Sequence, residues 1–266
     1  MAVFINWLKS LFFNFLNLFS SSDSKDYSTD IEVDDIEEDS SEDSKTEEDE
    51  VVEELDPVKS KAAKIAIIVG HTAKSPGAYN YKGESEFSFN SRIAEKVKNI
   101  MKEKYPSKKV RVFFREEGYY STAVTRVGQN VGKFGAKISL ELHFNSFHQV
   151  AYGCEVLIWE GAEHFLKTVK VADILTDNLA DKFDLRQRHR HNFPGYSVGD
   201  GVKILASRDR GALNIKACND NGVKHAMLIE PCFANKRTKE SEAIFENEDK
   251  YAEFLADELA SIDIKS

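Results

Sequence analysis

The sequence KIAIIVGH, residues 64–71, is the stretch from which the fold can be predicted. Its first seven residues are mostly apolar and predict a β-strand, and His71 follows directly. From Lys64 onward, short runs of this kind alternate with longer stretches of helical periodicity. This alternation predicts an α/β fold in which helices flank a mixed, mostly parallel sheet of about six strands.

Periodicity and terminal residues place the other expected elements. A helix is expected to begin near Ser85, and Ser121 is expected to cap another helix that ends at Gly135. The segment 153–159 is expected to be the hairpin partner or a near neighbour of a strand at 137–144. Further strands are expected at 109–115, 202–206 and 225–230, further helices at 163–183, 212–221 and 241–262, and a surface loop at 186–201.

Charge divides the chain into an acidic beginning and a mildly basic remainder. Between Asp23 and Asp56 there are 18 acidic residues and only two lysines, with repeated serines and few large apolar groups. Such a segment cannot bury enough apolar surface to offset the entropy that it would lose on ordering. We therefore expect residues 21–60 to be a disordered acidic linker and residues 61–266 to form the folded domain.

The folded part carries a charge opposite to that of the whole chain. Beyond residue 56 there are 33 basic and 27 acidic residues, a net charge of +6, whereas the whole chain has −9. This excess either attracts the domain to an anionic surface such as a cell wall or is ordinary surface charge. The sequence contains neither a basic helix nor an alternation of aromatic and basic residues, so nucleic-acid binding is not expected. We expect the protein to be a monomer. The three cysteines have no metal-like spacing and are interpreted as core residues.

Residues 3–19, VFINWLKSLFFNFLNLF, are apolar enough to seek a membrane. Four polar residues recur in them at helical spacing, so a helix would carry one polar stripe: Asn6, Lys9, Asn14 and Asn17. We expect residues 1–20 to form an amphipathic helix that lies in a membrane surface, because the segment is too short and too polar for a span. The alternatives are an uncleaved export signal or signal-anchor, and a helix that caps the folded domain.

Four chemically capable residues lie where a strand or helix meets a loop. His71 follows the first strand, His143 ends the strand at 137–144, and Glu230 closes the strand at 225–230. Glu86 stands at the start of the first long helix. In open α/β sheets ligands bind beyond the carboxyl ends of the strands, so we expect these four side chains to converge there.

The residue types favour zinc chemistry. Two imidazoles and a carboxylate are a common ligand set for catalytic zinc, which keeps a fourth position for water. A carboxylate outside the ligand set, here Glu230, would take a proton from that water and deliver it to a leaving amine. Each signal is weak by itself, because strand-end histidines are often structural and carboxylates at helix starts often serve the helix dipole. Their joint placement favours a zinc hydrolase.

Four local sequences also carry a family resemblance: VGHTAKSPGAYNYKG at 69–83, SEFSFNSRIA at 85–94, TRVGQNVGKFGAKISLELHFNS at 125–146 and MLIEPCFANK at 227–236. They resemble the zinc-dependent N-acetylmuramoyl-L-alanine amidases of the Amidase_3 family, which occur in bacterial autolysins and phage endolysins. The resemblance spans roughly residues 65–262. It implies three zinc ligands and one catalytic glutamate, in the order His71, Glu86, His143 and Glu230.

The same resemblance implies roles for neighbouring residues. Counting back from Asn90 in the second block selects Glu86 as the ligand, with Glu84 as the alternative. In the third block, Arg126 and Asn145, which stands two residues after His143, take the places of residues that support the site.

The implied reaction is hydrolysis of the amide that joins N-acetylmuramic acid to L-alanine in peptidoglycan, with Zn²⁺ as cofactor. The alternatives are a zinc peptidase that cuts the stem peptide and a non-catalytic module that binds the wall. The implied location is the cell envelope, periplasmic or extracellular and tethered to a membrane, or the host cytoplasm before release of a phage lysin.

One departure from the family pattern concerns the metal site. Glu141 stands two residues before His143, where the family usually has a small serine. In an alternating strand the two side chains point to the same face. Glu141 therefore either orients an imidazole ligand or is a solvated carboxylate on a half-exposed strand.

Overall fold

The computed structural model describes residues 63–189, 198–209 and 211–263. The predicted segments 1–20 and 21–60 lie outside these ranges, as does part of the predicted loop at 186–201. Among the helices within these ranges, none has both the length and the apolar character that a bilayer span requires.

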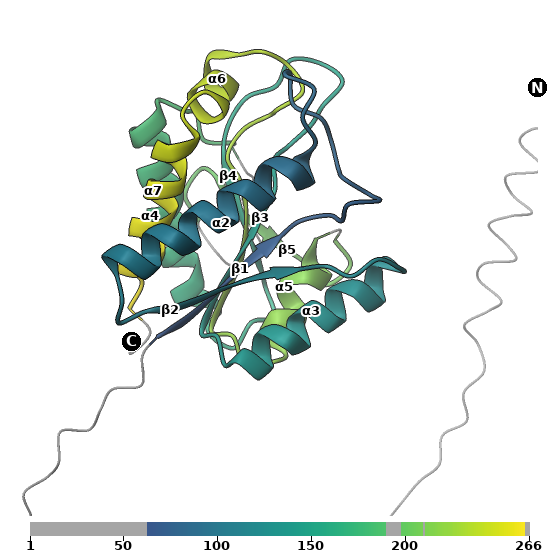
Figure 1. The fold of residues 1–266 in the computed structure, drawn as a ribbon, viewed down its shortest axis with the longest axis vertical. Coiled ribbons are helices and arrows are strands. Elements are labelled where there is room, and N and C mark those ends of the chain that lie inside the picture. The colour runs from purple at the N-terminus through teal and green to yellow at the C-terminus, as the bar shows by residue number, and fades with distance from the viewer. Residues whose placement is uncertain (1–62, 190–197, 210, 264–266) are drawn as a thin grey trace, which may run out of the picture. The chain divides into compact units, whose positions relative to one another are not determined.

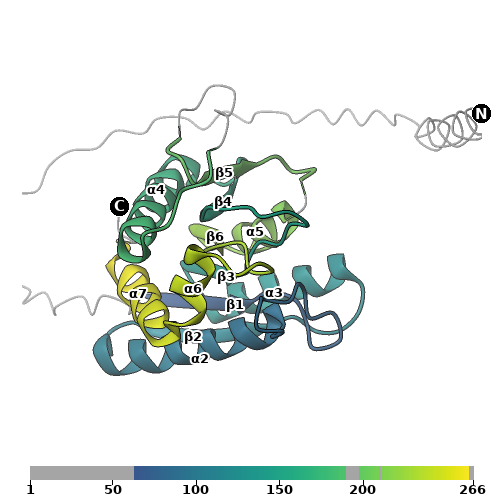
Figure 2. The same cartoon turned by 90° about the horizontal axis from the view of Figure 1, so that it is seen from above.

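A six-stranded sheet forms the centre of the domain (Figures 1 and 2). The strands lie in the order β2-β1-β3-β6-β4-β5, and neighbours are parallel except for β4 and β6. Their bounds are β1 Lys64–Val69, β2 Lys109–Phe114, β3 Ile138–Leu142, β4 Glu155–Trp159, β5 Val202–Leu205 and β6 His225–Glu230. The predicted mixed, mostly parallel sheet is confirmed.

Of the two predicted positions for β4, hairpin partner or near neighbour of β3, the structure shows the second. β6 lies between β3 and β4, pairing with β3 in parallel and with β4 in antiparallel fashion. β6 is buried along all but its last residue, which is typical of a strand covered on both faces. Such a strand is most stable in the interior of the sheet, so the chain returns to insert it there.

Helices cover both faces of the sheet (Figure 2). On one face lie α2 Glu86–Lys104, α4 Phe165–Phe183, α6 Lys239–Phe245 and α7 Glu248–Ser261, and on the other α3 Tyr120–Phe134 and α5 Ala212–Asn219. Alternate side chains of β1 reach the two cores, because successive residues of a strand point to opposite faces. Ile65, Ile67 and Val69 belong to the first core and Ala66 and Ile68 to the second.

Two helix boundaries differ from the predictions. α3 begins at Tyr120 with Tyr119 in the N-cap position, so Ser121 lies inside the helix and does not cap it; the predicted stop at Gly135, with φ 78°, is confirmed. The predicted helix 241–262 is two helices, α6 and α7. The break falls at Asn247, whose Nδ2 donates to the carbonyl of Ala243 at 3.0 Å and so satisfies a carbonyl at the end of α6.

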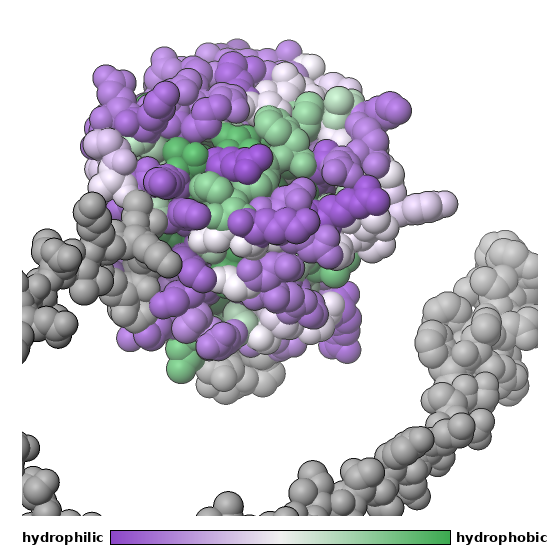
Figure 3. All heavy atoms as spheres, turned by 60° about the horizontal axis from the view of Figure 1, so that its bottom comes forward, coloured by the Kyte–Doolittle hydropathy of each residue, from purple (hydrophilic) through white to green (hydrophobic). Residues whose placement is uncertain are grey.

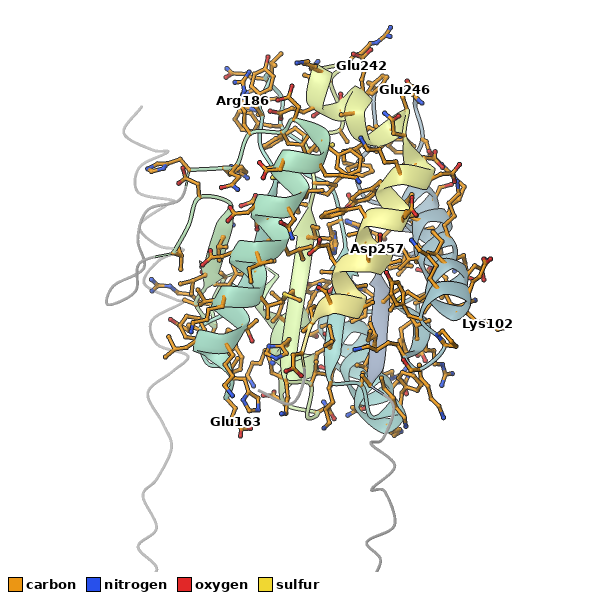
Figure 4. The ribbon with its side chains drawn as sticks, turned by 90° about the vertical axis from the view of Figure 1, so that its left-hand side faces the viewer. Lys102, Glu163, Arg186, Glu242, Glu246 and Asp257 are labelled. Carbon is orange, nitrogen blue, oxygen red and sulfur yellow. The ribbon has the colours of Figure 1, made fainter. Side chains whose placement is uncertain are left out.

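The helices of the first face also contact one another. The ring of Phe183 at the end of α4 packs edge-on against Tyr251 and Phe254 of α7. Figure 4 shows α4 running from near Glu163 at one end of the domain toward Arg186 at the other. Hydrophilic side chains cover most of the face seen in Figure 3, with hydrophobic ones exposed between them.

The strand register brings three loop starts together. Val69 at the end of β1 is level with Leu142 of β3, which is level with Ile229 of β6. Because these three strands are parallel neighbours, the residues that follow them lie at one edge of the sheet. This edge carries His71 and His143.

Candidate metal centre

His71 lies two residues beyond β1 in a strained backbone conformation. Its φ is 67°, in the left-handed region that residues other than glycine seldom adopt. The turn is held by hydrogen bonds from the Gly70 amide to the Leu142 carbonyl at 3.1 Å and from the Thr72 amide to the Ser75 carbonyl at 3.2 Å. Backbone strain of this kind persists where the surroundings enforce it, which happens at functional sites.

Glu86 is the first residue of α2, directly after the N-cap Ser85, and its side chain is buried. Its carboxylate accepts hydrogen bonds from the amides of Ala78 at 3.2 Å and Phe144 at 3.1 Å. The same carboxylate faces both histidines, with Oε2 at 3.2 Å from His71 Nε2 and Oε1 at 2.8 Å from His143 Nδ1. Burial alone would raise the pKa of Glu86, but the contacts with His143 and His71 lower it to about 2.

Glu84, the alternative ligand, points elsewhere. Its carboxylate pairs with the guanidinium of Arg92, whose Nη2 donates to Oε2 at 3.0 Å. Arg92 also binds Glu248 at the start of α7, so Glu84 helps to join two helices. Glu86 is therefore the carboxylate that the structure places between the histidines.

His143 is contacted through both ring nitrogens. Nδ1 faces Glu86, while Nε2 lies 3.1 Å from Oε1 of Glu141. Burial alone would lower the pKa of His143, but Glu141 and Glu86 raise it to about 9. The ring stands edge-on to that of His71, with 5.0 Å between the ring centroids.

The three side chains form a cluster that could hold a metal ion. One ligand atom from each of His71, Glu86 and His143 lies within 4.8 Å of the others. Two ligands bound to one tetrahedral zinc ion at about 2.0–2.1 Å would be roughly 3.3 Å apart. The nitrogen-to-oxygen distances of 3.2 and 2.8 Å are near this value, and imidazole with carboxylate is a donor set that suits zinc.

Two glycines leave room for this cluster. A Cβ on Gly77, whose φ is 80°, would lie 2.6 Å from Glu86 Oε2 and 2.7 Å from His71 Cδ2. A Cβ on Gly70 would lie 2.4 Å from His143 Cε1. Distances this short exclude any side chain at either position without displacement of a candidate ligand.

Glu141 is not the solvated carboxylate that was one of the two alternatives, because it is only 3% exposed. Besides facing His143, its Oε1 accepts from Asn214 Nδ2 at 3.0 Å and from the guanidinium of Arg115. Arg115, which follows β2, and Asn214 on α5 were not singled out from the sequence. Both are ordinary surface residue types, and only the topology brings them to Glu141.

Glu230 ends β6 directly opposite Glu155 of β4. The two carboxyl groups share a side-chain hydrogen bond, and burial followed by the charge of Glu155 raises the pKa of Glu230 to about 8. Glu155 was not predicted as a site residue. The available signal was a charged residue inside the apolar run GCEVLIW, where a buried strand has no other polar group.

The two predicted supporting residues lie in different surroundings. Asn145 donates from Nδ2 to Glu155 at 2.7 Å, and its main chain bonds Cys232 and Ala234, just beyond β6. Arg126 is exposed on α3, where its Nη1 donates to Glu116 at 2.6 Å. A role for Arg126 in the site stays a prediction.

A pocket of about 670 Å³ joins these groups. Its walls include the metal-ligand candidates, the pair Glu155 and Glu230, and Arg115. The candidate ligands and the candidate proton carrier are thus exposed to one cavity, which is large enough for a substrate of several functional groups.

The chain belongs to the Amidase_3 family, described as N-acetylmuramoyl-L-alanine amidase, whose model matches residues 65–261. It is therefore an enzyme, and it belongs to the class of peptidoglycan amidases. No curated protein matches the chain.

Several solved structures share the fold. The catalytic domain of the CD27L endolysin targeting Clostridia difficile is 19% identical with a TM-score of 0.56, over 76% of this chain and 99% of that one. An N-acetylmuramoyl-L-alanine amidase from Clostridium difficile 630 is 17% identical with a TM-score of 0.55, over 76% and 97%. The catalytic domain of CwlV from Bacillus (Paenibacillus) polymyxa var. colistinus is 19% identical with a TM-score of 0.52, over 74% and 96%.

Proposed function

We propose that this protein hydrolyses the amide bond between the lactyl group of N-acetylmuramic acid and L-alanine in peptidoglycan, with zinc bound by His71, Glu86 and His143. The observation that carries the proposal is one pocket that contains this three-ligand cluster and a separate, half-buried carboxyl group, Glu230. Amide hydrolysis by a metal-bound water requires these two components. The family match supports the choice of bond.

When bound, zinc would polarise the amide carbonyl and lower the pKa of a coordinated water to about 7. Glu230 is the protein residue that transfers the proton during hydrolysis. In its ionised form, Glu230 takes a proton from the attacking water and delivers it to the nitrogen of L-alanine as the C–N bond breaks. The carbonyl carbon gains the water oxygen, so the products are a lactyl carboxylate and a stem peptide with a free amino terminus.

Glu141 orients one ligand in this proposal. It accepts a hydrogen bond from Nε2 of His143, which fixes the tautomer that leaves Nδ1 free to bind metal next to Glu86. Arg115 and Asn214 hold Glu141 in place. A buried carboxylate with these partners remains ionised, and burial opposed by Arg115 and His143 leaves the pKa of Glu141 at about 2.

The site of action follows from the substrate. Peptidoglycan is the proposed partner, and the enzyme reaches it in the cell envelope or, if it is a phage lysin, after release from the host cytoplasm. The amphipathic segment at residues 1–20 would hold the enzyme at a membrane surface while the acidic segment spans the distance to the wall. Co-sedimentation of the full chain and of a variant lacking residues 1–20 with lipid vesicles tests the membrane contact, which is refuted if both sediment equally.

The reaction is tested with purified cell wall. The zinc-loaded protein is expected to solubilise wall, and removal of zinc with a chelator is expected to abolish this until zinc is restored. Glu230→Gln is expected to bind zinc like the parent but to solubilise wall at least 100-fold more slowly, because general-base catalysis typically contributes about 10²–10⁴-fold. A Glu230→Gln variant as active as the parent contradicts the mechanism.

A further inference from the structure

Glu155 lies beside the proposed proton carrier in a position that the strand pairing determines. β4 and β6 are antiparallel, and Glu155 is the register partner of Glu230. Residues directly opposite on antiparallel strands project to the same face at about 4.5–5.5 Å between their Cβ atoms. The two carboxyl groups therefore meet on the pocket wall, and they share a side-chain hydrogen bond.

Glu155 is itself held by two further side chains. It is 1% exposed, and its Oε1 accepts from Asn145 Nδ2 at 2.7 Å and from Nη1 of Arg188. The guanidinium of Arg188 also lies over the ring of Phe233, 4.9 Å from the ring centroid. A buried carboxylate is tolerated only with such compensation.

The backbone of Arg188 is hydrogen-bonded to the residue that precedes β4. The Arg188 amide donates to the carbonyl of Cys154 at 3.0 Å, and the Gly201 amide donates to the Arg188 carbonyl at 2.8 Å. Cys154, the residue before Glu155, is therefore hydrogen-bonded to Arg188, whose positive charge faces the Glu155 carboxylate. These backbone bonds hold Arg188 next to Glu155, whose carboxylate it contacts.

A second carboxyl group next to Glu230 lowers the stability of the fold unless its charge is compensated. Two buried carboxylates at hydrogen-bond distance repel each other, so they are stable only when they share a proton or when a cation neutralises one of them. Arg188 supplies that cation to Glu155. Glu230 is then the member of the pair that exchanges a proton with other groups in the pocket.

We propose that Glu155 is a positioning residue for the reaction: held by Arg188 and Asn145, it fixes the carboxyl group of Glu230 in the orientation needed for proton transfer. This inference rests on the proposed function, because it assigns Glu230 as the proton carrier. Glu155 contacts Glu230 and acts through it.

The first test is a double-mutant cycle with the zinc-loaded full-length protein and purified wall. Glu155→Gln is expected to lower kcat about 10- to 100-fold, the loss typical of residues that support an active-site group, with KM and bound zinc unchanged. In a Glu230→Gln background the same change is expected to alter kcat less than twofold. Glu258→Gln on α7 is the matched control and should leave kcat unchanged, because Glu258 lines a different pocket, together with His225 at the start of β6.

An equal loss in both backgrounds would contradict the inference, because Glu155 would then act independently of Glu230. Full activity of Glu155→Gln would contradict it as well. If Glu155→Gln does not fold, Arg188→Gln replaces it in the cycle, since Arg188 lies in a partly exposed segment. The same non-additivity with Glu230→Gln is expected, and additive losses refute the inference.

A second readout does not depend on turnover. In protein labelled with ¹³C at the glutamate carboxyl carbons, the Glu230 resonance is identified by its absence in Glu230→Gln. Its titration midpoint is expected to fall in Glu155→Gln and to stay constant in Glu258→Gln. An unchanged midpoint in Glu155→Gln refutes the pairing. If the parent does not cleave wall, the proposed function fails, whereas this measurement still decides whether Glu155 controls Glu230.

Discussion

Replacement of Gly77 by alanine is expected to weaken zinc binding through the position of a single methyl group. The new Cβ would lie 2.6 Å from Glu86 Oε2 and 2.7 Å from His71 Cδ2, whereas ordinary contacts begin at 3.4 Å. One or both candidate ligands must therefore move by about 0.7–0.8 Å. Because a misplacement of about 1 Å can cost 10²-fold at a functional site, we expect the dissociation constant for zinc to rise at least tenfold, or about 1.4 kcal/mol.

Gly83 provides a matched control in the same loop. It has the same φ of 80° as Gly77, but a Cβ there would meet nothing within 4 Å. Both Gly77→Ala and Gly83→Ala should lose about 1–2 kcal/mol of stability from left-handed backbone strain. Only Gly77→Ala should lose zinc affinity as well.

The assay is zinc titration of the metal-free proteins in competition with a chromophoric chelator, together with urea unfolding. The reasoning is refuted if Gly77→Ala binds zinc as tightly as the parent, or if Gly83→Ala loses as much zinc affinity as Gly77→Ala. Either result would mean that the candidate ligands do not bind metal in the arrangement described.

Three further predictions concern individual carboxyl groups. Glu141→Gln should weaken zinc binding about 10- to 100-fold by releasing the ring of His143, as measured by the same chelator competition; unchanged affinity would exclude an orienting role. Glu86→Gln should abolish stoichiometric zinc binding, measured by elemental analysis, whereas Glu84→Gln should retain it. The reverse result would mean that Glu84, not Glu86, is the ligand. The raised pKa of Glu230, about 8 against an ordinary 4.5, means that the folded metal-free protein holds a proton that the unfolded chain releases. Its free energy of unfolding should therefore fall as pH rises from 4.5 to about 8, and urea unfolding should show a flatter slope over this range in Glu230→Gln.

The sheet and the candidate metal ligands could be predicted from the sequence because both depend on local signals. Apolar runs such as KIAIIV predict buried strands, and polar residues directly after them mark the carboxyl edge of a parallel sheet. The resemblance of the second block to the family pattern, counted back from Asn90, led to the preference for Glu86 over Glu84, and the structure places Glu86 between His71 and His143.

The supporting residues could not be predicted, because their contacts depend on strand order. Glu155 meets Glu230 only because β6 inserts between β3 and β4, and the sequence had left open whether β4 is the hairpin partner or a near neighbour of β3. Arg115 reaches Glu141 from the loop that follows β2, and Asn214 reaches it from α5. The cap at Ser121 was wrong for a related reason: cap propensity is weak compared with the packing that decides where α3 begins.

The measurement that tests the central claim most directly is mass spectrometry of the products released from purified peptidoglycan by the zinc-loaded protein, with Glu230→Gln as the blank. The proposed reaction predicts intact stem peptides that begin with a free L-alanine amino group, and glycan chains whose muramic acid carries a free lactyl carboxylate. Shortened stem peptides still attached to muramic acid would contradict it, because they would show that the same pocket cleaves a peptide bond instead.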